Sequence, residues 1–182
     1  MIRCGIGYDV HRFAKGRKLT LGGVEITHSH GLEGHSDADV LSHAIADALL
    51  GAVAAGDIGQ HFPNTDQSIR GMSSIDILRQ VTALLAENKA RPINVDATIL
   101  AEAPKIAPHI PAMRKVIAQA LGVKESRIGI KATTNEGLGA IGRSEGIAAI
   151  AVATVEMVGR DRRAHRKSNR RPGPAATGSP AS

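Results

Sequence analysis

Residues 2–11 read IRCGIGYDVH, and apolar and polar side chains alternate along this stretch. The apolar set is Ile2, Cys4, Ile6, Tyr8 and Val10, and the intervening set is Arg3, Gly5, Gly7, Asp9 and His11. A period of two residues is typical of a β-strand with one face buried. The stretch therefore predicts a half-buried strand, with Asp9 and His11 projecting from the face opposite the apolar one.

Working outward from this strand, the remaining patterns predict alternating strands and helices. A hairpin is expected over residues 18–26, turning at Gly22-Gly23, and residues 27–37 are interpreted as a loop. A helix should begin at a capping-box-like pair, Ser36 and Asp39, and end at Gly56 and Asp57. An ordered loop over 57–72 then precedes helices at about 73–87 and 107–121 and strands at 93–101, 127–132 and 146–158. This order predicts an α/β, α+β-like sandwich with a mixed sheet and helices on one face.

The chain has 182 residues, which favours one domain, and its aromatic residues are Tyr8, Phe13 and Phe62 alone. Its core must therefore be built from Ala, Ile, Leu and Val and will contain few large side chains. A core of this kind often needs a second subunit to finish burying its apolar surface.

The net charge of +6 lies entirely in the last part of the chain. Residues 160–182 carry seven basic residues and one acidic residue, whereas residues 1–159 carry equal numbers of each. The Pro-, Gly- and Ala-rich composition of 160–182 predicts a disordered basic tail after a folded domain of residues 1–159. Because the domain has neither a basic surplus nor an aromatic stacking platform, we expect no nucleic-acid partner for it.

Cys4 is the single cysteine, so an intramolecular disulfide is impossible and a reducing compartment is indicated. The sequence holds no uncharged apolar run of about 18 residues, and its start lacks the pattern of a signal region. We therefore expect a cytoplasmic protein without a membrane segment.

Asp9, His11 and His43 are candidate metal ligands. Asp9 and His11 leave the same strand face about 6 to 7 Å apart, close enough for both side chains to reach one ion. His43 lies off the apolar stripe of its predicted helix, with Asp39 and Asp47 about one turn away on either side. One of these carboxylates could orient the second ring nitrogen of His43. An Asp-His-His set suits a catalytic zinc site, although the same residues could instead form a solvated face.

Familiar phosphate-binding motifs are absent from the sequence. Gly5-Ile6-Gly7 lacks the third glycine of a dinucleotide fingerprint, and no G-K-[ST] occurs. Three polar loops remain as candidate site material, around residues 34–37, 57–66 and 131–136. Single Ser, Thr and Asp residues in such loops can also serve only as turn caps.

Several motifs occur in order along the chain: GYDVHRF at residues 7–13, GHSDAD at 34–39, DIG at 57–59, FPNTD at 62–66, AEAPK at 101–105 and KATTNE at 131–136. Together they resemble the 2-C-methyl-D-erythritol 2,4-cyclodiphosphate synthases of the non-mevalonate isoprenoid pathway. The resemblance covers about residues 1–158 and leaves the basic tail outside the family pattern.

This resemblance implies a lyase that forms a homotrimer with active sites between adjacent subunits. Its substrate would be 4-diphosphocytidyl-2-C-methyl-D-erythritol 2-phosphate, a small cytidine diphosphate derivative. The 2-phosphate of this molecule attacks its own β-phosphorus, closes the 2,4-cyclodiphosphate and expels CMP. Catalysis would then consist of positioning and charge stabilisation rather than attack by a protein nucleophile.

The resemblance also implies roles for individual residues. Asp9, His11 and His43 would hold one zinc, or a similar transition metal, in each subunit, and Glu136 would help to place magnesium or manganese on the diphosphate. His35 and Thr134 match positions that stabilise the transition state. The residues that would contact the erythritol phosphate, beside Asp9 and His11, are His35, Ser36, Asp57, Ile58, Gly59, Phe62, Pro63, Asn64, Thr65 and Asp66. Those that would contact the cytidine diphosphate are Ala101, Glu102, Ala103, Pro104, Lys105, Ile106, Ala107, Thr133, Thr134, Asn135 and Glu136.

Around the trimer axis the chain both matches and departs from the family. Arg143 and Glu145 match positions facing the axis. Ala140 stands where the family commonly has Phe, and Gly137 and Ile141 also differ, which changes the lining of the central cavity. Two other classes of function remain as alternatives. A zinc-dependent phosphohydrolase acting on a nucleoside diphosphate derivative would use the same ligands, and a nucleic-acid-binding protein would depend on the basic tail.

Overall fold

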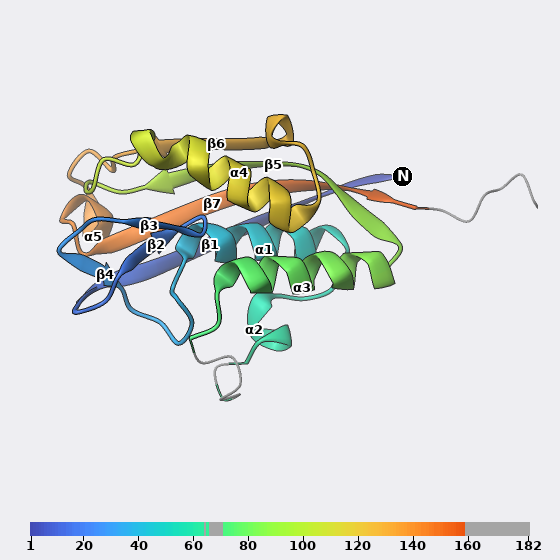
Figure 1. The fold of residues 1–182 in the computed structure, drawn as a ribbon, viewed down its shortest axis with the longest axis horizontal. Coiled ribbons are helices and arrows are strands. Elements are labelled where there is room, and N and C mark those ends of the chain that lie inside the picture. Colours follow the sequence, from blue (N-terminus) through green and yellow to red (C-terminus); the bar gives the residue numbers. More distant parts are fainter. Residues whose placement is uncertain (64, 66–70, 159–182) are drawn as a thin grey trace, which may run out of the picture.

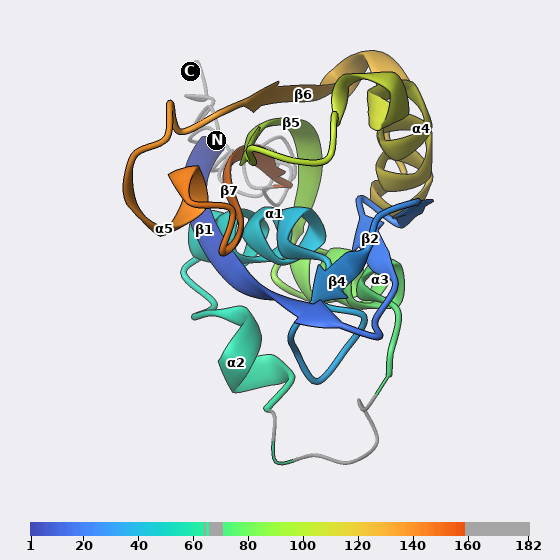
Figure 2. The same ribbon diagram turned by 90° about the vertical axis from the view of Figure 1, so that its left-hand side faces the viewer.

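The computed structural model describes residues 1–63, 65 and 71–158, so Asn64, Asp66 and the proposed tail lie outside the described residues. These residues form a five-stranded mixed sheet with helices packed on one face (Figure 1, Figure 2). The sheet strands are β1 (Ile2–Lys15), β4 (His30–Leu32), β5 (Ala90–Leu100), β6 (Ile128–Thr133) and β7 (Gly146–Met157). Their order is β4-β1-β7-β5-β6; β5 and β6 pair in parallel and the other neighbours are antiparallel. The mixed sheet and the one-sided arrangement of the helices confirm the predicted fold class.

The helices are α1 (Val40–Ala52), α2 (Ile58–His61), α3 (Ser74–Glu87), α4 (Ile110–Leu121) and α5 (Gly139–Gly142). A separate hairpin of β2 (Leu19–Leu21) and β3 (Val24–Ile26) turns at the predicted glycines, and short 3-10 turns cover Ala107–His109 and Glu125–Arg127. The segment that contains α4 connects β5 to β6. Two parallel neighbouring strands need a long crossover connection of this kind. Among the described residues, no helix has both the length and the apolar character needed to cross a membrane.

Several predicted element boundaries were wrong: β1 continues past His11 to Lys15, and β5 begins at Ala90 instead of residue 93. The segment predicted as a loop over 27–37 contains β4, whose three residues are too few to show an alternating pattern. Helix α1 ends at Ala52, because Ala54 takes a left-handed conformation with φ of +57° before Gly56. Its N-cap is Asp39, whose carboxylate accepts a hydrogen bond from the backbone N–H of Ser42, so Ser36 lies outside the helix. Helices α2 and α5 have four residues each and are too short for a periodic signal.

Strand β1 is half-buried, as predicted, but the buried face is the one that carries the glycines. Gly5 and Gly7 lie directly on α1, where a Cβ atom on Gly7 would stand 2.0 Å from the carbonyl oxygen of Ala44. A Cβ atom on Gly5 would likewise stand 2.1 Å from the carbonyl oxygen of Ala48. The backbones of β1 and α1 therefore touch, and Asp9, on the same face, points toward α1.

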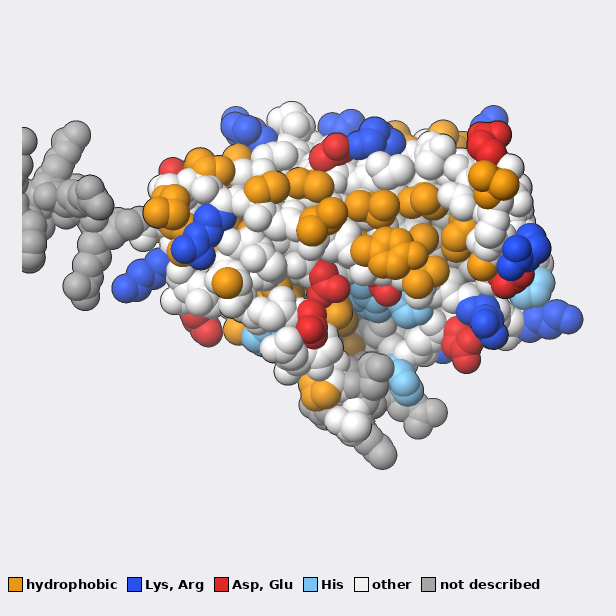
Figure 3. All heavy atoms as spheres, turned by 180° about the vertical axis from the view of Figure 1, so that it is seen from behind, with side chains coloured by type: hydrophobic (Ala, Val, Ile, Leu, Met, Phe, Trp, Pro, Cys, Tyr) orange, Lys and Arg blue, Asp and Glu red, His pale blue; other side chains and the backbone are white. Residues whose placement is uncertain are grey.

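The apolar residues of β1 instead form an exposed surface on the other side of the sheet (Figure 3). In the antiparallel register Tyr8 pairs with Ile150 and Ile6 pairs with Val152, so β1 and β7 contribute to the same patch. Ile6 is 70% exposed and Tyr8 57%. We call this surface the apolar sheet face; its members are Ile2, Ile6, Tyr8, Val10, Ile150 and Val152. A contiguous exposed apolar surface of this kind, on a sheet whose other face is covered by helices, is typical of a protein–protein interface.

Candidate active site

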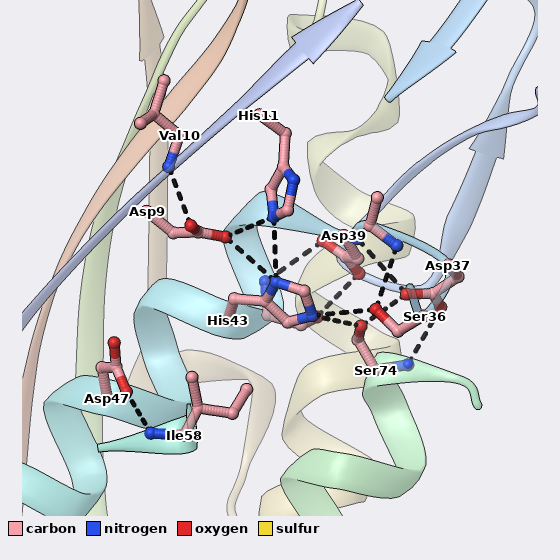
Figure 4. A network of polar contacts seen from close by, with 12 residues as sticks. Asp9, Val10, His11, Ser36, Asp37, Asp39, His43, Asp47, Ile58 and Ser74 are labelled. Atoms are coloured by element: carbon pink, nitrogen blue, oxygen red, sulfur yellow. Dashed lines mark hydrogen bonds and ion pairs between the residues drawn. The ribbon is translucent and has the colours of Figure 1, made fainter. Parts of the chain in front are cut away.

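Asp9 and His11 of β1 and His43 of α1 meet in one cluster at the β1–α1 contact (Figure 4). The Oδ2 atom of Asp9 lies 2.9 Å from Nε2 of His11 and 3.0 Å from Nδ1 of His43. The two imidazole nitrogens are 3.2 Å apart. The prediction that these residues could share one metal ion is therefore confirmed in its geometry.

The outward-facing atoms of each candidate ligand are held by the protein. Nδ1 of His11 lies 2.5 Å from the carbonyl oxygen of Glu33, and Oδ1 of Asp9 accepts a hydrogen bond from the backbone N–H of Val10 at 2.9 Å. A carbonyl oxygen can only accept, so Nδ1 of His11 carries a proton, and Nε2 is the ring nitrogen that faces the cluster and would bind a metal. Fixing one ring nitrogen in this way is how proteins select the metal-binding tautomer of histidine.

The partner of the second ring nitrogen of His43 differs from the predicted one. Its Nε2 atom lies 2.9 Å from Oγ of Ser74 and 3.2 Å from Oγ of Ser36. The carboxylate of Asp39 points instead to the β2–β3 turn, and that of Asp47 accepts from the backbone N–H of Ile58 at 2.7 Å. The prediction that Asp39 or Asp47 orients His43 was wrong, because both carboxylates are used to fasten backbone segments to α1.

The donor set fits a divalent transition metal. Two neutral imidazole nitrogens and one carboxylate oxygen are typical zinc ligands, and tetrahedral coordination would place them about 3.3 Å apart. The observed separations of 2.9–3.2 Å are close to this spacing, and the three side chains are largely buried. Three protein ligands leave a coordination position open, which is the arrangement of catalytic rather than structural zinc sites.

The electrostatics of the cluster keep Asp9 ionised. Burial by itself would raise the pKa of Asp9, but hydrogen bonds and charge attraction from His11 and His43 outweigh it and lower that pKa far below its ordinary value. For His11, burial favours the neutral ring, yet the contact with Asp9 raises its pKa above the ordinary value of 6.5. A metal ion bound in the cluster would therefore replace a proton that the charge of Asp9 helps to hold on the imidazole of His11.

A second set of predicted residues lines a cavity of about 470 Å³ beyond the carboxyl ends of β5 and β6. Its lining consists of Ala101, Glu102, Pro104, Lys105, Ile106, Ala107, Ala132, Thr133 and Thr134. Oε1 of Glu102 accepts hydrogen bonds from the backbone N–H groups of Asn135, at 2.8 Å, and Gly137, at 3.4 Å. This carboxylate fastens the loop after β6 to the loop after β5, so two segments of the predicted nucleotide site are brought together.

Thr134 and Glu136 also meet, although not through strand geometry. Strand β6 ends at Thr133, and Glu136 takes a left-handed conformation with φ of +50°. The hydroxyl of Thr134 donates to Oε1 of Glu136 at 2.9 Å. Among the described residues, no hydrogen bond or ion pair joins this pair to the metal cluster, and β7 separates β1 from β5 in the sheet.

The residues predicted to contact the erythritol phosphate lie in several environments. Ser36 is beside His43, and His35 is exposed on the loop that precedes α1. Asp57 is the N-cap of α2, and its carboxylate accepts from the backbone N–H of Gln60 at 3.0 Å. The side chain of Phe62 belongs to the buried core, so any substrate contact there would come from its backbone.

Arg17 is a site-supporting residue that sequence reasoning missed. Its guanidinium donates to the carbonyl oxygens of Gly34, at 2.7 Å, and Ser36, at 2.8 Å. This bidentate clamp holds the loop that carries His35 and Ser36 against the start of the β2–β3 hairpin. Just before the start of β7, Arg143 donates to Oε1 of Glu145 at 2.7 Å, directly after α5, which contains Ala140.

Comparison with known proteins finds a matching family, closely similar sequences and a similar solved structure. Residues 2–156 match the YgbB family. The 2-C-methyl-D-erythritol 2,4-cyclodiphosphate synthase of Alkaliphilus metalliredigens is 60% identical over 154 residues, which cover 85% of this chain and 97% of that protein. The enzyme of the same name from Symbiobacterium thermophilum is 60% identical over 151 residues, covering 83% of this chain and 96% of that protein. The structure of IspF from Plasmodium falciparum in complex with CDP is 34% identical and superposes with a TM-score of 0.75, covering 87% of this chain and 97% of that one.

Proposed function

Because this chain belongs to the YgbB family, we infer that it catalyses the reaction for which its relatives are named. It converts 4-diphosphocytidyl-2-C-methyl-D-erythritol 2-phosphate to 2-C-methyl-D-erythritol 2,4-cyclodiphosphate and CMP. An oxygen of the 2-phosphate forms a bond to the β-phosphorus, and the bond from that phosphorus to the oxygen of the α-phosphate breaks. The observation that carries this conclusion is the 60% identity over nearly the full length of the relatives, together with a formed Asp-His-His cluster.

The chemistry asks the protein for positioning and for positive charge, since phosphoryl transfer needs no protein nucleophile. A zinc ion held by Asp9, His11 and His43 would supply charge that stabilises the β-phosphate as the new bond forms. His35 and Thr134 would donate hydrogen bonds to phosphate oxygens as charge develops. Lys105 in the cavity beside β5 would attract the diphosphate, and Glu102 would keep the two cavity loops in register.

The site is completed by a second copy of the chain in a homotrimer. Within one chain the metal cluster lies on β1 and the nucleotide cavity lies at the ends of β5 and β6, with β7 between them. The apolar sheet face provides the surface that a partner would cover, and the core is poor in aromatic residues. Arg143 and Glu145 would then face the trimer axis, next to Ala140.

Glu136 would hold magnesium or manganese on the substrate diphosphate, since a carboxylate is a preferred ligand of these ions. Replacing Glu136 with Ala should raise the magnesium or manganese concentration needed for half-maximal turnover while bound zinc stays unchanged. An unchanged divalent-ion dependence would mean that the substrate alone holds this ion. Cytoplasmic location, which rests on the single cysteine, stays a prediction.

Phosphorus NMR of the products tests the proposed reaction. The full chain, incubated with the substrate, should release CMP and give the two coupled resonances of a cyclic diphosphate. Metal analysis of the same preparation should find about one zinc per chain. Release of CMP with only linear phosphate products would instead identify a zinc-dependent phosphohydrolase.

A further inference from the structure

We propose that Ser74, fixed by Asp37, is a positioning residue for the metal centre, because it holds His43 in the tautomer and orientation that a metal ion requires. This inference rests on the proposed role of Asp9, His11 and His43 as metal ligands. Ser74 is the first residue of α3 and lies 31 positions along the chain from His43, so a third element of the fold supports the site.

The contact is a chain of three groups from different elements (Figure 4). Nε2 of His43 lies 2.9 Å from Oγ of Ser74, and that hydroxyl also makes a short hydrogen bond to Oδ1 of Asp37. The backbone N–H of Ser74 donates to Oδ2 of the same carboxylate at 2.9 Å. Ser74 is fully buried, so water does not compete for its hydroxyl.

The direction of each hydrogen bond follows from the number of protons available. The carboxylate of Asp37 only accepts, so it takes the single hydroxyl proton of Ser74. Oγ of Ser74 can then only accept from His43, which places the second proton of this pair on Nε2 of the imidazole. Nδ1 of His43, 3.0 Å from Oδ2 of Asp9 and 3.2 Å from Nε2 of His11, is then the atom that a metal ion would bind, in place of a proton shared with Asp9.

Ser36 cannot set the tautomer in the same way. Its Oγ atom is farther from Nε2 of His43, at 3.2 Å, and accepts a hydrogen bond from the backbone N–H of Ala38. In the described part of the chain no carboxylate takes its hydroxyl proton, so this group can turn to donate or accept. Asp37, in contrast, is anchored by Ser74 and by the backbone N–H of Asp39 at 3.2 Å.

The adjacent residue offers a matched control. Ser73 is the N-cap of α3 and accepts from the backbone N–H of Ile75 at 3.2 Å, and no hydrogen bond joins its hydroxyl to His43. Replacing Ser73 or Ser74 with Ala therefore removes one hydroxyl from the same helix end, but only the second change releases the imidazole. A purely structural role for these serines would give both variants similar metal affinity.

The test is zinc affinity, measured by competition with a chromophoric chelator on the full chain after metal removal. Ser74→Ala should bind zinc 10- to 100-fold more weakly than the unaltered chain, the usual effect of losing a group that orients a metal-binding histidine. Ser73→Ala should stay within about twofold of the unaltered chain, because the ligands keep their partners. Asp37→Asn, which weakens the acceptor of the Ser74 proton, should also lower the affinity and provides the answer if Ser74→Ala does not fold.

Nitrogen-15 NMR of the metal-free chains gives a second readout that helix stability alone does not change. His43 should be protonated at Nε2 in the unaltered chain and in Ser73→Ala, and should show a mixture of tautomers in Ser74→Ala. Unchanged zinc affinity and tautomer in Ser74→Ala, or an equal loss in Ser73→Ala, would overturn the proposal. If the unaltered chain bound no zinc, the metal centre itself would fail as well, whereas the NMR product assay tests the reaction independently.

Discussion

Nδ1 of His43 lies 3.0 Å from Oδ2 of Asp9, and this separation spans the contact between α1 and β1. Gly7 precedes Asp9 by two positions, and its backbone rests on the turn of α1 that contains Ala44, the residue after His43. The distance between these two candidate metal ligands is therefore set by a contact between two backbones. Any change that pushes β1 away from α1 should open the cluster.

Replacing Gly7 with Ala should both destabilise the protein and weaken zinc binding. The added methyl group would meet the carbonyl oxygen of Ala44 at 2.0 Å, and backbone atoms cannot turn aside as a side chain can. Overpacking of this kind costs about 1–3 kcal/mol. Gly51→Ala, whose Cβ would have its nearest neighbour at 3.8 Å, should be neutral or stabilise α1 by about 0.5–1 kcal/mol. Thermal unfolding and zinc titration of the two variants check this, and equal behaviour would contradict it.

Replacing His43 with Ala should remove bound zinc and activity while leaving the fold intact. The side chain faces Asp9 and His11 of β1 and would contribute a ligand, whereas the neighbouring core residues hold the helix on the sheet. Turnover should fall by at least about 100-fold, as for the loss of one preorganised electrostatic group. Metal analysis and circular dichroism provide the measurement, with His28→Ala, outside the cluster, as control. Full zinc occupancy in His43→Ala would show that the ligand assignment is wrong.

Stabilisation by zinc should grow as the pH rises. In the metal-free chain, burial favours neutral His11, but Asp9 outweighs this and raises the pKa of His11 above 6.5. The stability from this protonated contact is complete below pH 6.5 and is lost as the pH rises through the raised pKa. Zinc needs the neutral ring, so the gain in Tm on adding zinc should increase between about pH 6 and pH 8. Differential scanning fluorimetry at several pH values measures it; a gain independent of pH would contradict competition between zinc and this proton.

Replacing Thr134 with Ala should lower turnover much more than substrate affinity. In the free protein its hydroxyl donates to Glu136, and we expect it to turn to a phosphate oxygen as charge develops there. Loss of one such donor typically costs about 10²–10³ in kcat. Thr134→Ser, which keeps the hydroxyl, is the matched control. Steady-state kinetics separate the two effects, and an increase in KM alone would make Thr134 a binding contact instead.

Replacing Ile6 with Lys should disrupt the proposed trimer. Ile6 is 70% exposed in the single chain and lies within the apolar sheet face, where a partner would have to bury the new charge. Gln119→Lys adds the same charge to the exposed surface of α4 and should leave assembly unchanged. Light scattering should report three subunits for the unaltered chain, for Gln119→Lys and for a chain ending at Val158. A stable, active monomer of the unaltered chain would refute the placement of the sites between subunits.

Local signals predicted most of the elements well. Helix α3 is capped by Ser73 and Asn88, and α4 by Gly122 in a left-handed conformation; these caps were predictable because they depend on residues a few positions apart. The orientation of β1 could not be obtained in this way. Alternation shows that Ile6 and Gly7 face opposite sides, but not whether helices or another subunit cover the apolar side. The repeated glycines at 5 and 7 were the available signal of close backbone packing.

In the candidate site, too, contacts between residues close in sequence could be predicted, whereas contacts between distant residues could not. Asp9 and His11 could be paired from their spacing, whereas their meeting with His43 depends on how α1 packs on β1. The partner of His43 was missed because Ser74 looks like one more helix-capping residue in the sequence. Arg17 gave no motif at all, since it acts on backbone carbonyl groups of a distant loop.

The backbone contact at Gly7 also limits the size of the ion that the cluster can bind. Calcium keeps its oxygen ligands at about 2.3–2.6 Å and prefers six to eight of them, whereas zinc binds nitrogen at about 2.0–2.1 Å. A larger ion would have to spread Asp9 from His43, and that movement would separate a strand from a helix rather than rotate a side chain. Selection against large cations would then depend on the rigidity of the main chain at Gly7, a residue that is not itself a metal ligand.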